Sequence, residues 1–315
     1  YGIPVPAVDG NVLRILMRVS ADNSDIMKQS VKTRVEQALQ QVLQSAKSQR
    51  VPTMTQLVDL IAINELLGTV ESSGDGKNAN LVAQLETESL AAKAAEFKTT
   101  NNDDTIGWIR IPNTNVDYPV VYKAGVENYA YYESKGYDKQ YSKDGVIWAD
   151  YECTFPELSQ NTTLYGHNWH NIYTPRTQAN MQANDLMFSL VMSYNYTDFA
   201  QENPFVYFST TEQDYVFQVF ASYYTDLNFG YNYAQMSQED FQKVIAEAKA
   251  KSLSNYNVPV TSEDKIVTLS TCTRVHGNTN NQRFVVMAKL VPVGTPSTTI
   301  STHSNPIAYN SSIDA

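Results

Sequence analysis

The 315-residue sequence predicts a mainly β fold preceded by an α-helical N-terminal region. Tyr, Thr and Asn are crowded after position 105, and this composition favours strands and turns over long helices. Short apolar runs bounded by turn residues recur over positions 106–292. Before position 105, the apolar residues instead recur at helical spacing. We therefore place the main domain boundary near residue 100.

Composition and charge exclude some classes of function. The chain is 42% hydrophobic and 18% charged, as in an ordinary globular protein. Its formal net charge of −10 argues against nucleic acid as a partner, because phosphate binding needs a concentration of Lys and Arg. No stretch has the about 20 apolar residues of a membrane-spanning helix, and the pattern of a signal peptide is not found. The chain does not begin with Met, so we expect a fragment or a processed form.

The helical region divides into two parts. Residues 1–45 hold two runs of apolar residues at helical spacing. Residues 46–105 predict an amphipathic helix around Leu57–Leu66 and a second helix over about 79–97, separated by the loop ESSGDGKNAN. The polar run TTNNDDT then ends the second helix.

The start of the chain carries a short resemblance to another family. The segment PVPAVDGNVLRIL, Pro4 to Leu16, resembles the part of adenine-mismatch DNA glycosylases that holds their catalytic aspartate, here Asp9. The glutamate acid, the hairpin-helix DNA anchor and the cysteine-ligated iron–sulfur cluster of that family have no counterpart in this chain. Asp9 with Asn11 is also typical of a helix cap. We expect residues 1–45 to be a non-functional glycosylase-like fragment, with a remnant that still binds DNA as the alternative.

Alternating apolar residues predict the strands of the second part. A hairpin is expected over Gly107–Tyr122, with a second one over about 204–225. Single strands are expected in GVIWADY, from Gly145, and in TTLYGHNW, from Thr162. A short helix is expected over 186–194.

One clear helix interrupts the strands. Ser237 is a good N-cap, and Asp240 stands where the acid of a capping box would be. Phe241, Val244 and Ile245 then continue at helical spacing. The residues after Val293 are rich in Thr, Ser, Pro and Asn, and we expect 293–315 to be a disordered tail.

The stretch from Lys265 to Leu290 holds the strongest candidates for chemistry. Cys272 closes one β-branched run and Arg283 opens the next, so antiparallel pairing would bring thiol and guanidinium together. A thiolate is the nucleophilic form of cysteine, and a nearby cation favours it. Arg274 is a rival, but a strand holds a side chain more firmly than a loop does. A disulfide with Cys153, the other of the two cysteines, is an alternative.

A cysteine nucleophile also needs a base within reach. His167 follows a strand in a turn that begins with Gly166, so its ring can project from a fixed edge. His170 gives an H-x-x-H spacing, but a zinc site needs three or four convergent ligands, and we expect no metal. His276 lies in the loop after Cys272, and the fourth histidine lies in the tail.

Residues 106–292 resemble a class B sortase. The family's motifs occur in order: GWIRIPNTNVDYPVVY is similar to the opening hairpin, GVIWADY to the next core strand, TLYGHNW to the histidine motif and TLSTC to the nucleophile motif. The strand RFVVMAKL then carries the arginine, and the helix from Ser237 lies where class B members have an added helix. The resemblance implies a closed, mostly antiparallel sortase-type β-barrel with an inserted helix, and residues 46–105 are similar in position to the N-terminal helices.

The same resemblance implies a cysteine transpeptidase. Cys272 would attack a sorting-signal peptide near a Thr and form a thioacyl-enzyme. His167 would act first as acid and then as base, and Arg283 would hold the peptide or stabilise the oxyanion. Ser270 and Thr271 are weaker candidates for substrate binding. No cofactor is implied.

The implied partners are surface proteins with a C-terminal sorting signal and an amine of a peptidoglycan precursor or a pilin. The implied location is the extracellular face of a Gram-positive-type membrane, reached through an anchor that we expect outside this chain. A cysteine hydrolase on the same barrel is one alternative. A catalytically inactive barrel used only for binding is another.

Overall fold

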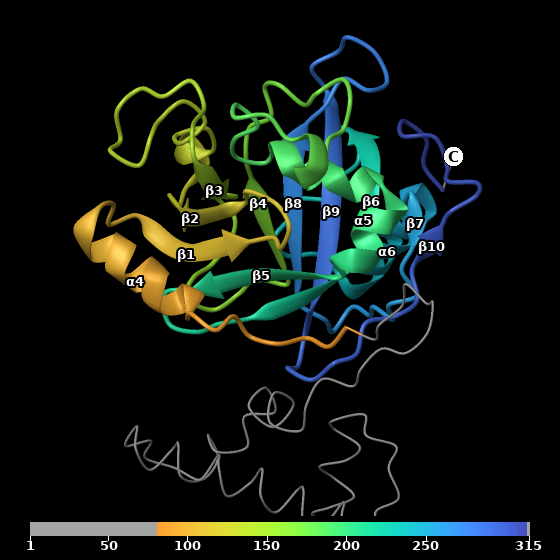
Figure 1. The fold of residues 1–315 in the computed structure, drawn as a ribbon, viewed down its shortest axis with the longest axis horizontal. Helices are drawn as coiled ribbons and strands as arrows, with labels where there is room; N and C mark the ends of the chain where they lie inside the picture. The colour runs from red at the N-terminus through yellow and green to blue at the C-terminus, as the bar shows by residue number, and fades with distance from the viewer. Residues whose placement is uncertain (1–80, 314–315) are drawn as a thin grey trace, which may run out of the picture. The chain divides into compact units, whose positions relative to one another are not determined.

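In the computed structural model, which describes residues 81–313, eight strands close into a barrel in the order β1-β2-β3-β4-β8-β9-β6-β5 (Figure 1). The closed barrel and the mainly β fold predicted above are confirmed. The barrel strands are β1 (Thr105–Arg110), β2 (Asp117–Val121), β3 (Ile147–Ala149), β4 (Asn161–Tyr165), β5 (Phe205–Thr210), β6 (Val216–Asp226), β8 (Ile266–Cys272) and β9 (Gln282–Val291).

Strand pairing follows the predicted hairpins. β1 pairs with β2 and β5 with β6, all antiparallel, and pairing of β1 with β5 closes the barrel. The barrel also contains two parallel pairs, β2 with β3 and β4 with β8. The parallel β4–β8 pair joins segments about a hundred residues apart, and it places the residues after β4 beside the end of β8.

The barrel is filled by aromatic and β-branched side chains. Phe208, Phe217 and Phe284 are each fully buried. Truncating such a ring to alanine costs about 3–5 kcal/mol, because the surrounding side chains relax only partly into the cavity. The core therefore fixes the strand register that the site depends on.

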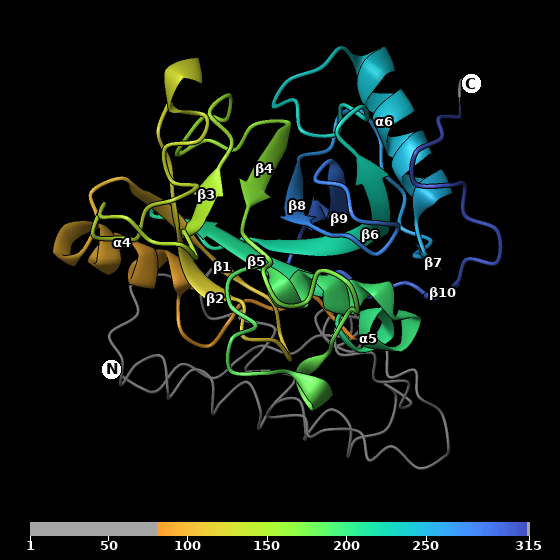
Figure 2. The same ribbon diagram turned by 90° about the horizontal axis from the view of Figure 1, so that it is seen from above.

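β6 departs from its sequence pattern. Its alternating apolar residues predict that one face of the strand is exposed to solvent. Every residue from Val216 to Asp226 is nevertheless buried. The outer face is covered because α6 (Gln238–Lys251) packs on it, as Figure 2 shows. Phe241 and Ile245 of α6 belong to the same hydrophobic cluster as Phe220 of β6.

The start of α6 agrees with the prediction from its sequence. Ser237 is the N-cap, and its Oγ accepts a hydrogen bond of 3.1 Å from the Asp240 backbone N–H. The Asp240 carboxylate accepts a second hydrogen bond of 2.7 Å from the Ser237 hydroxyl, where a full capping box would use the Ser237 backbone N–H. The helix thus begins where predicted with half of that motif.

The helix predicted over 79–97 begins later than expected. The α4 helix spans Leu90–Thr100, and the Ser89 side chain caps it by accepting from the Ala92 N–H. The preceding residues from 81 are extended, and Ala83 exchanges backbone hydrogen bonds of 2.8 Å with residues 294 and 295. Those bonds satisfy the backbone N–H and C=O groups of Ala83 without a helical turn. The helical spacing of the apolar residues therefore does not determine the structure of this segment.

The remaining elements are short. The helix expected over 186–194 is a 3₁₀-helix instead, η4. Their bounds are η2 (Val126–Asn128), η3 (Gln178–Asn180), η4 (Ser189–Asn195), α5 (Thr197–Glu202), β7 (Ser254–Asn255) and β10 (Ser301–Thr302).

The tail expected to be disordered is ordered up to residue 313. β10 pairs antiparallel with β7, and Ile300 is buried. The buried ammonium of Lys251 donates to the backbone carbonyls of Tyr309 and Ser311. The prediction from composition is wrong here because backbone groups, which every sequence has, make most of the hydrogen bonds of this segment.

The predictions for residues 1–80 lie outside the described residues. They concern the glycosylase-like fragment with Asp9 and most of the helical region. Within residues 81–313, no helix is both long and apolar enough to cross a membrane.

We predict that Ser237→Ala destabilises the fold by about 1 kcal/mol, because the N–H of Asp240 loses its acceptor. Thermal unfolding followed by circular dichroism measures the change, with an expected fall in Tm of about 2–4 °C for a domain of this size. Ser237→Thr keeps the hydroxyl and should unfold close to the wild-type temperature. Equal losses for both variants would contradict the role of the cap.

Candidate active site

Strand register brings the three predicted catalytic residues to one edge of the barrel. In the antiparallel β8–β9 pair, Cys272 lies directly opposite Arg283. In the parallel β4–β8 pair, Tyr165 lies opposite Ser270, and His167 follows two residues later and lines the same cleft as Cys272. The predicted antiparallel pairing of Cys272 with Arg283 is thus confirmed.

Cys272 and Cys153 lie in opposite environments. Cys272 is exposed at the end of β8, the one exposed residue of an otherwise buried strand. Cys153 is 1% exposed, and burial raises the pKa of its thiol to about 12. Both are free thiols, so the alternative of a Cys153–Cys272 disulfide is wrong.

Contacts on two sides hold the end of β8 against the residues after β4. The Thr271 hydroxyl donates a 2.8 Å hydrogen bond to the Gly166 carbonyl. The buried Asn168 amide donates to the Cys272 carbonyl at 3.3 Å. A Cβ at Gly166 would lie 2.5 Å from the Ile147 side chain, so only glycine allows this close approach. The backbone on either side of His167 is therefore fixed to the strand that carries Cys272.

The imidazole of His167 is fixed by its own contacts. Its Nε2 lies 2.6 Å from the Glu133 carbonyl oxygen. Since a carbonyl only accepts hydrogen bonds, Nε2 carries the proton, and Nδ1 is left as the atom that gains or loses one. The ring stacks on Trp169 at a centroid distance of 4.9 Å. This arrangement suits a general acid and base.

The guanidinium of Arg283 is held by the loop that precedes it. Its Nη1 donates to the carbonyl oxygens of Asn280 and Gln282, each at 2.9 Å. Arg274, the rival candidate, instead donates to the Asn280 side chain at 2.8 Å and to the Tyr173 hydroxyl at 3.3 Å. Arg283 lines the same cleft as Cys272 and His167, and Arg274 is not among the lining residues.

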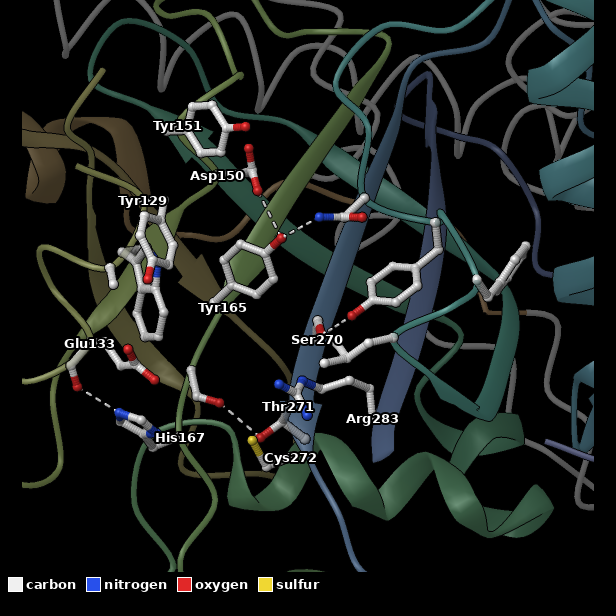
Figure 3. Close-up of a pocket in the computed structure, with 17 residues that line it drawn as sticks. Tyr129, Glu133, Asp150, Tyr151, Tyr165, His167, Ser270, Thr271, Cys272 and Arg283 are labelled. Carbon is white, nitrogen blue, oxygen red and sulfur yellow. Dashed lines mark hydrogen bonds between the residues drawn. The ribbon is translucent and has the colours of Figure 1, made fainter. Parts of the chain in front are cut away.

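That cleft has a volume of about 380 Å³ (Figure 3). Tyr129 and Leu227 line it and are 67% and 57% exposed, which leaves apolar surface at its rim for a ligand. Tyr231 lies deeper, and burial raises the pKa of its phenol. An apolar cleft with a few convergent polar groups is the usual form of a binding site.

Ser270 and Thr271 also line the cleft, but both are buried. The Ser270 hydroxyl shares a hydrogen bond of 2.8 Å with the Tyr231 hydroxyl, and the Thr271 hydroxyl bonds to the backbone of Gly166. Both hydroxyls therefore have partners within the fold. Their contact with substrate stays a prediction.

A hydrogen-bonded group of three polar residues is among the cleft residues that were missed from the sequence. The Tyr165 hydroxyl donates to the Asp150 carboxylate at 2.8 Å and accepts from the Asn232 amide at 2.9 Å. Burial raises the pKa of Asp150. Asp150 and Tyr165 could have been suspected as polar residues at strand ends, but Asn232 comes from the irregular segment between β6 and α6.

The other histidines do not line the cleft. Shielding from water lowers the pKa of His276, whose ring stacks on Tyr309. Among residues 81–313, no group of three or more His, Cys, Asp or Glu side chains could hold a metal ion.

The barrel domain matches a known protein family. A family model for the sortase domain matches residues 109–291, which is more than half of the chain. The chain therefore belongs to the sortase family, whose members are cysteine transpeptidases.

Within that family, the similarity is to class B. Sortase B of Staphylococcus aureus (strain NCTC 8325 / PS 47) is 30% identical over 193 residues, covering 61% of this chain and 72% of the relative. Sortase B of Listeria monocytogenes is 29% identical, covering 60% and 71%. The structure of a Staphylococcus aureus sortase B–substrate complex matches with a TM-score of 0.54 and 28% identity, covering 65% of this chain and 88% of that one.

We predict that a thiosulfonate reagent modifies one thiol in the native protein, that of Cys272, because Cys153 is buried and protonated. Intact-mass spectrometry at mildly alkaline pH should show a single adduct. Cys272→Ala should show none until the protein is unfolded, when Cys153 becomes accessible. Rapid labelling of folded Cys272→Ala would mean that Cys153 is accessible after all.

Proposed function

We propose that Cys272 is the nucleophile, His167 the general acid and base, and Arg283 the group that stabilises the oxyanion. The observation that carries this proposal is that Cys272, His167 and Arg283 line one cleft, where Cys272 of β8 lies opposite Arg283 of β9. Ordered strands hold catalytic groups more closely than loops do. Cys153 is not a rival nucleophile, because it is buried.

In the first step, the Cys272 thiolate attacks a backbone carbonyl carbon of the sorting peptide, next to a Thr. The carbonyl oxygen becomes an oxyanion beside the Arg283 guanidinium, an interaction that strengthens as charge develops. The carbon–nitrogen bond then breaks, and protonated His167 gives its proton to the leaving amine. The product is a thioester on Cys272.

In the second step, an amine takes the place of the leaving group. His167, now neutral, accepts a proton from the incoming amine as its nitrogen attacks the thioester carbon. The carbon–sulfur bond breaks, and the Cys272 thiolate and protonated His167 are restored. Water attacking the same thioester would give a carboxylic acid, so the distinction between transpeptidase and hydrolase lies in the second nucleophile.

The substrate we propose is a surface protein with a C-terminal sorting signal. The similar Staphylococcus aureus structure is a sortase B–substrate complex, and the exposed rim residues Tyr129 and Leu227 offer apolar surface for an extended peptide. The acceptor would be an amine of a peptidoglycan precursor or of a pilin. For this chemistry we propose a location on the extracellular face of a Gram-positive-type membrane.

We predict that Cys272→Ala abolishes turnover of sorting-signal peptides, because no other exposed thiol lines the cleft. Arg283→Ala should lower kcat by on the order of 100-fold, as removal of an oxyanion donor does. Arg274→Ala is the comparison and should lose far less activity than Arg283→Ala, because Arg274 does not line the cleft, although the substitution removes a hydrogen bond to the Asn280 side chain. A screen of short peptides with quenched fluorophores measures all three. Equal losses for the two arginine variants would show that the wrong arginine was chosen.

We also predict that an added amine redirects the product from acid to amide. Mass spectrometry of the products, with and without a small primary amine, separates the two outcomes. A transpeptidase gives amide in proportion to amine concentration while thioester formation is unchanged. A product that stays entirely acid at every amine concentration tested would favour the cysteine hydrolase.

A further inference from the structure

The C-terminal tail lies beyond the part of the chain that matches the family model. The match ends at residue 291, whereas the ordered chain continues to residue 313. Figure 2 shows this last segment running beside α6. The tail therefore lies outside the family match, and two of its contacts reach α6 and the loop between β8 and β9.

The first contact fixes the tail to α6. The Lys251 side chain is 1% exposed, and its ammonium donates to the carbonyl oxygen of Tyr309 at 2.9 Å and to that of Ala308 at 3.4 Å. The Ile307 N–H donates to the Ala250 carbonyl at 3.0 Å. The buried charge of Lys251 also pairs with Glu247 at 3.4 Å, and the bonds to the tail satisfy its remaining donors and hold the backbone on both sides of Tyr309 in place.

The second contact reaches the loop between β8 and β9, residues 273–281, which we name the arginine loop. The Tyr309 ring stacks on the His276 ring at a centroid distance of 4.5 Å and an interplanar angle of 8°. The same imidazole makes a T-shaped contact with the Tyr224 ring of β6, at a centroid distance of 4.8 Å. His276 is thus held between the tail and the barrel wall.

From His276, hydrogen bonds lead to the arginine. The backbone N–H of His276 donates to the Gln282 side-chain oxygen at 3.0 Å. The buried Gln282 amide donates in turn to the Gly277 carbonyl at 2.8 Å and the Thr279 hydroxyl at 2.7 Å, so it organises the inside of the loop. The carbonyl of Asn280, in the same loop, accepts from Arg283 Nη1. The loop therefore supplies one of the two hydrogen bonds that hold the guanidinium, and the Gln282 carbonyl of β9 supplies the other.

We propose that the C-terminal tail positions Arg283, with Tyr309 and His276 as positioning residues that fix the arginine loop by stacking. This rests on the proposed function, in which Arg283 stabilises the oxyanion. Displacing a catalytic group by about 1 Å can cost about 100-fold in rate, so a contact remote from the cleft can act on kcat. Loss of the stack frees the loop, and the guanidinium no longer stays beside the carbonyl that Cys272 attacks.

The test uses the full chain with single substitutions. Tyr309→Ala removes the stacked ring, while Tyr309→Phe, the matched control, keeps it. We expect Tyr309→Ala to lower kcat for the sorting peptide about tenfold with little change in KM, and Tyr309→Phe to stay within about twofold. His276→Ala should behave like Tyr309→Ala, and His276→Phe, which can still stack, like the wild type.

A double-mutant cycle separates positioning from simple stability. In the Arg283→Ala background, Tyr309→Ala should cause no further loss, because the residue on which it acts is gone. Residual rates are followed by mass spectrometry of thioester formation with enzyme in excess. The same fractional loss in both backgrounds, or no loss in the wild-type background, would overturn the proposal. Turnover by Cys272→Ala would instead overturn the proposed function, so the two failures are distinguishable.

Discussion

The site depends on the position of β8 between its two neighbours. A strand with hydrogen-bonded partners on both sides has its register fixed by both of them, and a slip of one residue would move every side chain to the opposite face of the sheet. Six of the seven residues of β8 are buried, so such a slip would cost several core contacts. The register that brings Cys272 opposite Arg283, in the cleft that His167 also lines, is therefore protected by the whole core, although the three side chains themselves add little to it.

Rigidity at this edge is unevenly distributed. Cys272 belongs to a strand and needs no further support. His167 lies just past a strand and depends on Gly166, Asn168 and the Glu133 carbonyl. Arg283 begins a strand, but its guanidinium reaches back to a carbonyl of the preceding loop. Cys272 is thus held by its strand, His167 by the contacts around its turn, and Arg283 in part by the loop before it.

The sequence predicted what is local or periodic. The pairing of Cys272 with Arg283 followed from two apolar runs around one loop, and the position of Ser237 from capping preferences. The parallel β4–β8 pair could not be predicted from such patterns, because it joins distant segments through hydrogen bonds that any two strands could form. For that reason the residues alone made His167 a candidate without showing which strand it would face, and Asn232 was missed.

The tail shows why composition misled the prediction of disorder. Low hydrophobicity indicates disorder because few apolar groups are available to offset the entropy of ordering. Here Ile300 of the tail is itself buried. In addition, Lys251 of α6 is a buried cation that pairs with Glu247 and takes further acceptors from backbone carbonyls of the tail, which are available in any sequence. The Tyr309 ring of the tail stacks on His276 in the loop between β8 and β9. A polar segment can therefore be ordered by a charge buried elsewhere, and a single aromatic side chain then suffices to connect it to the site.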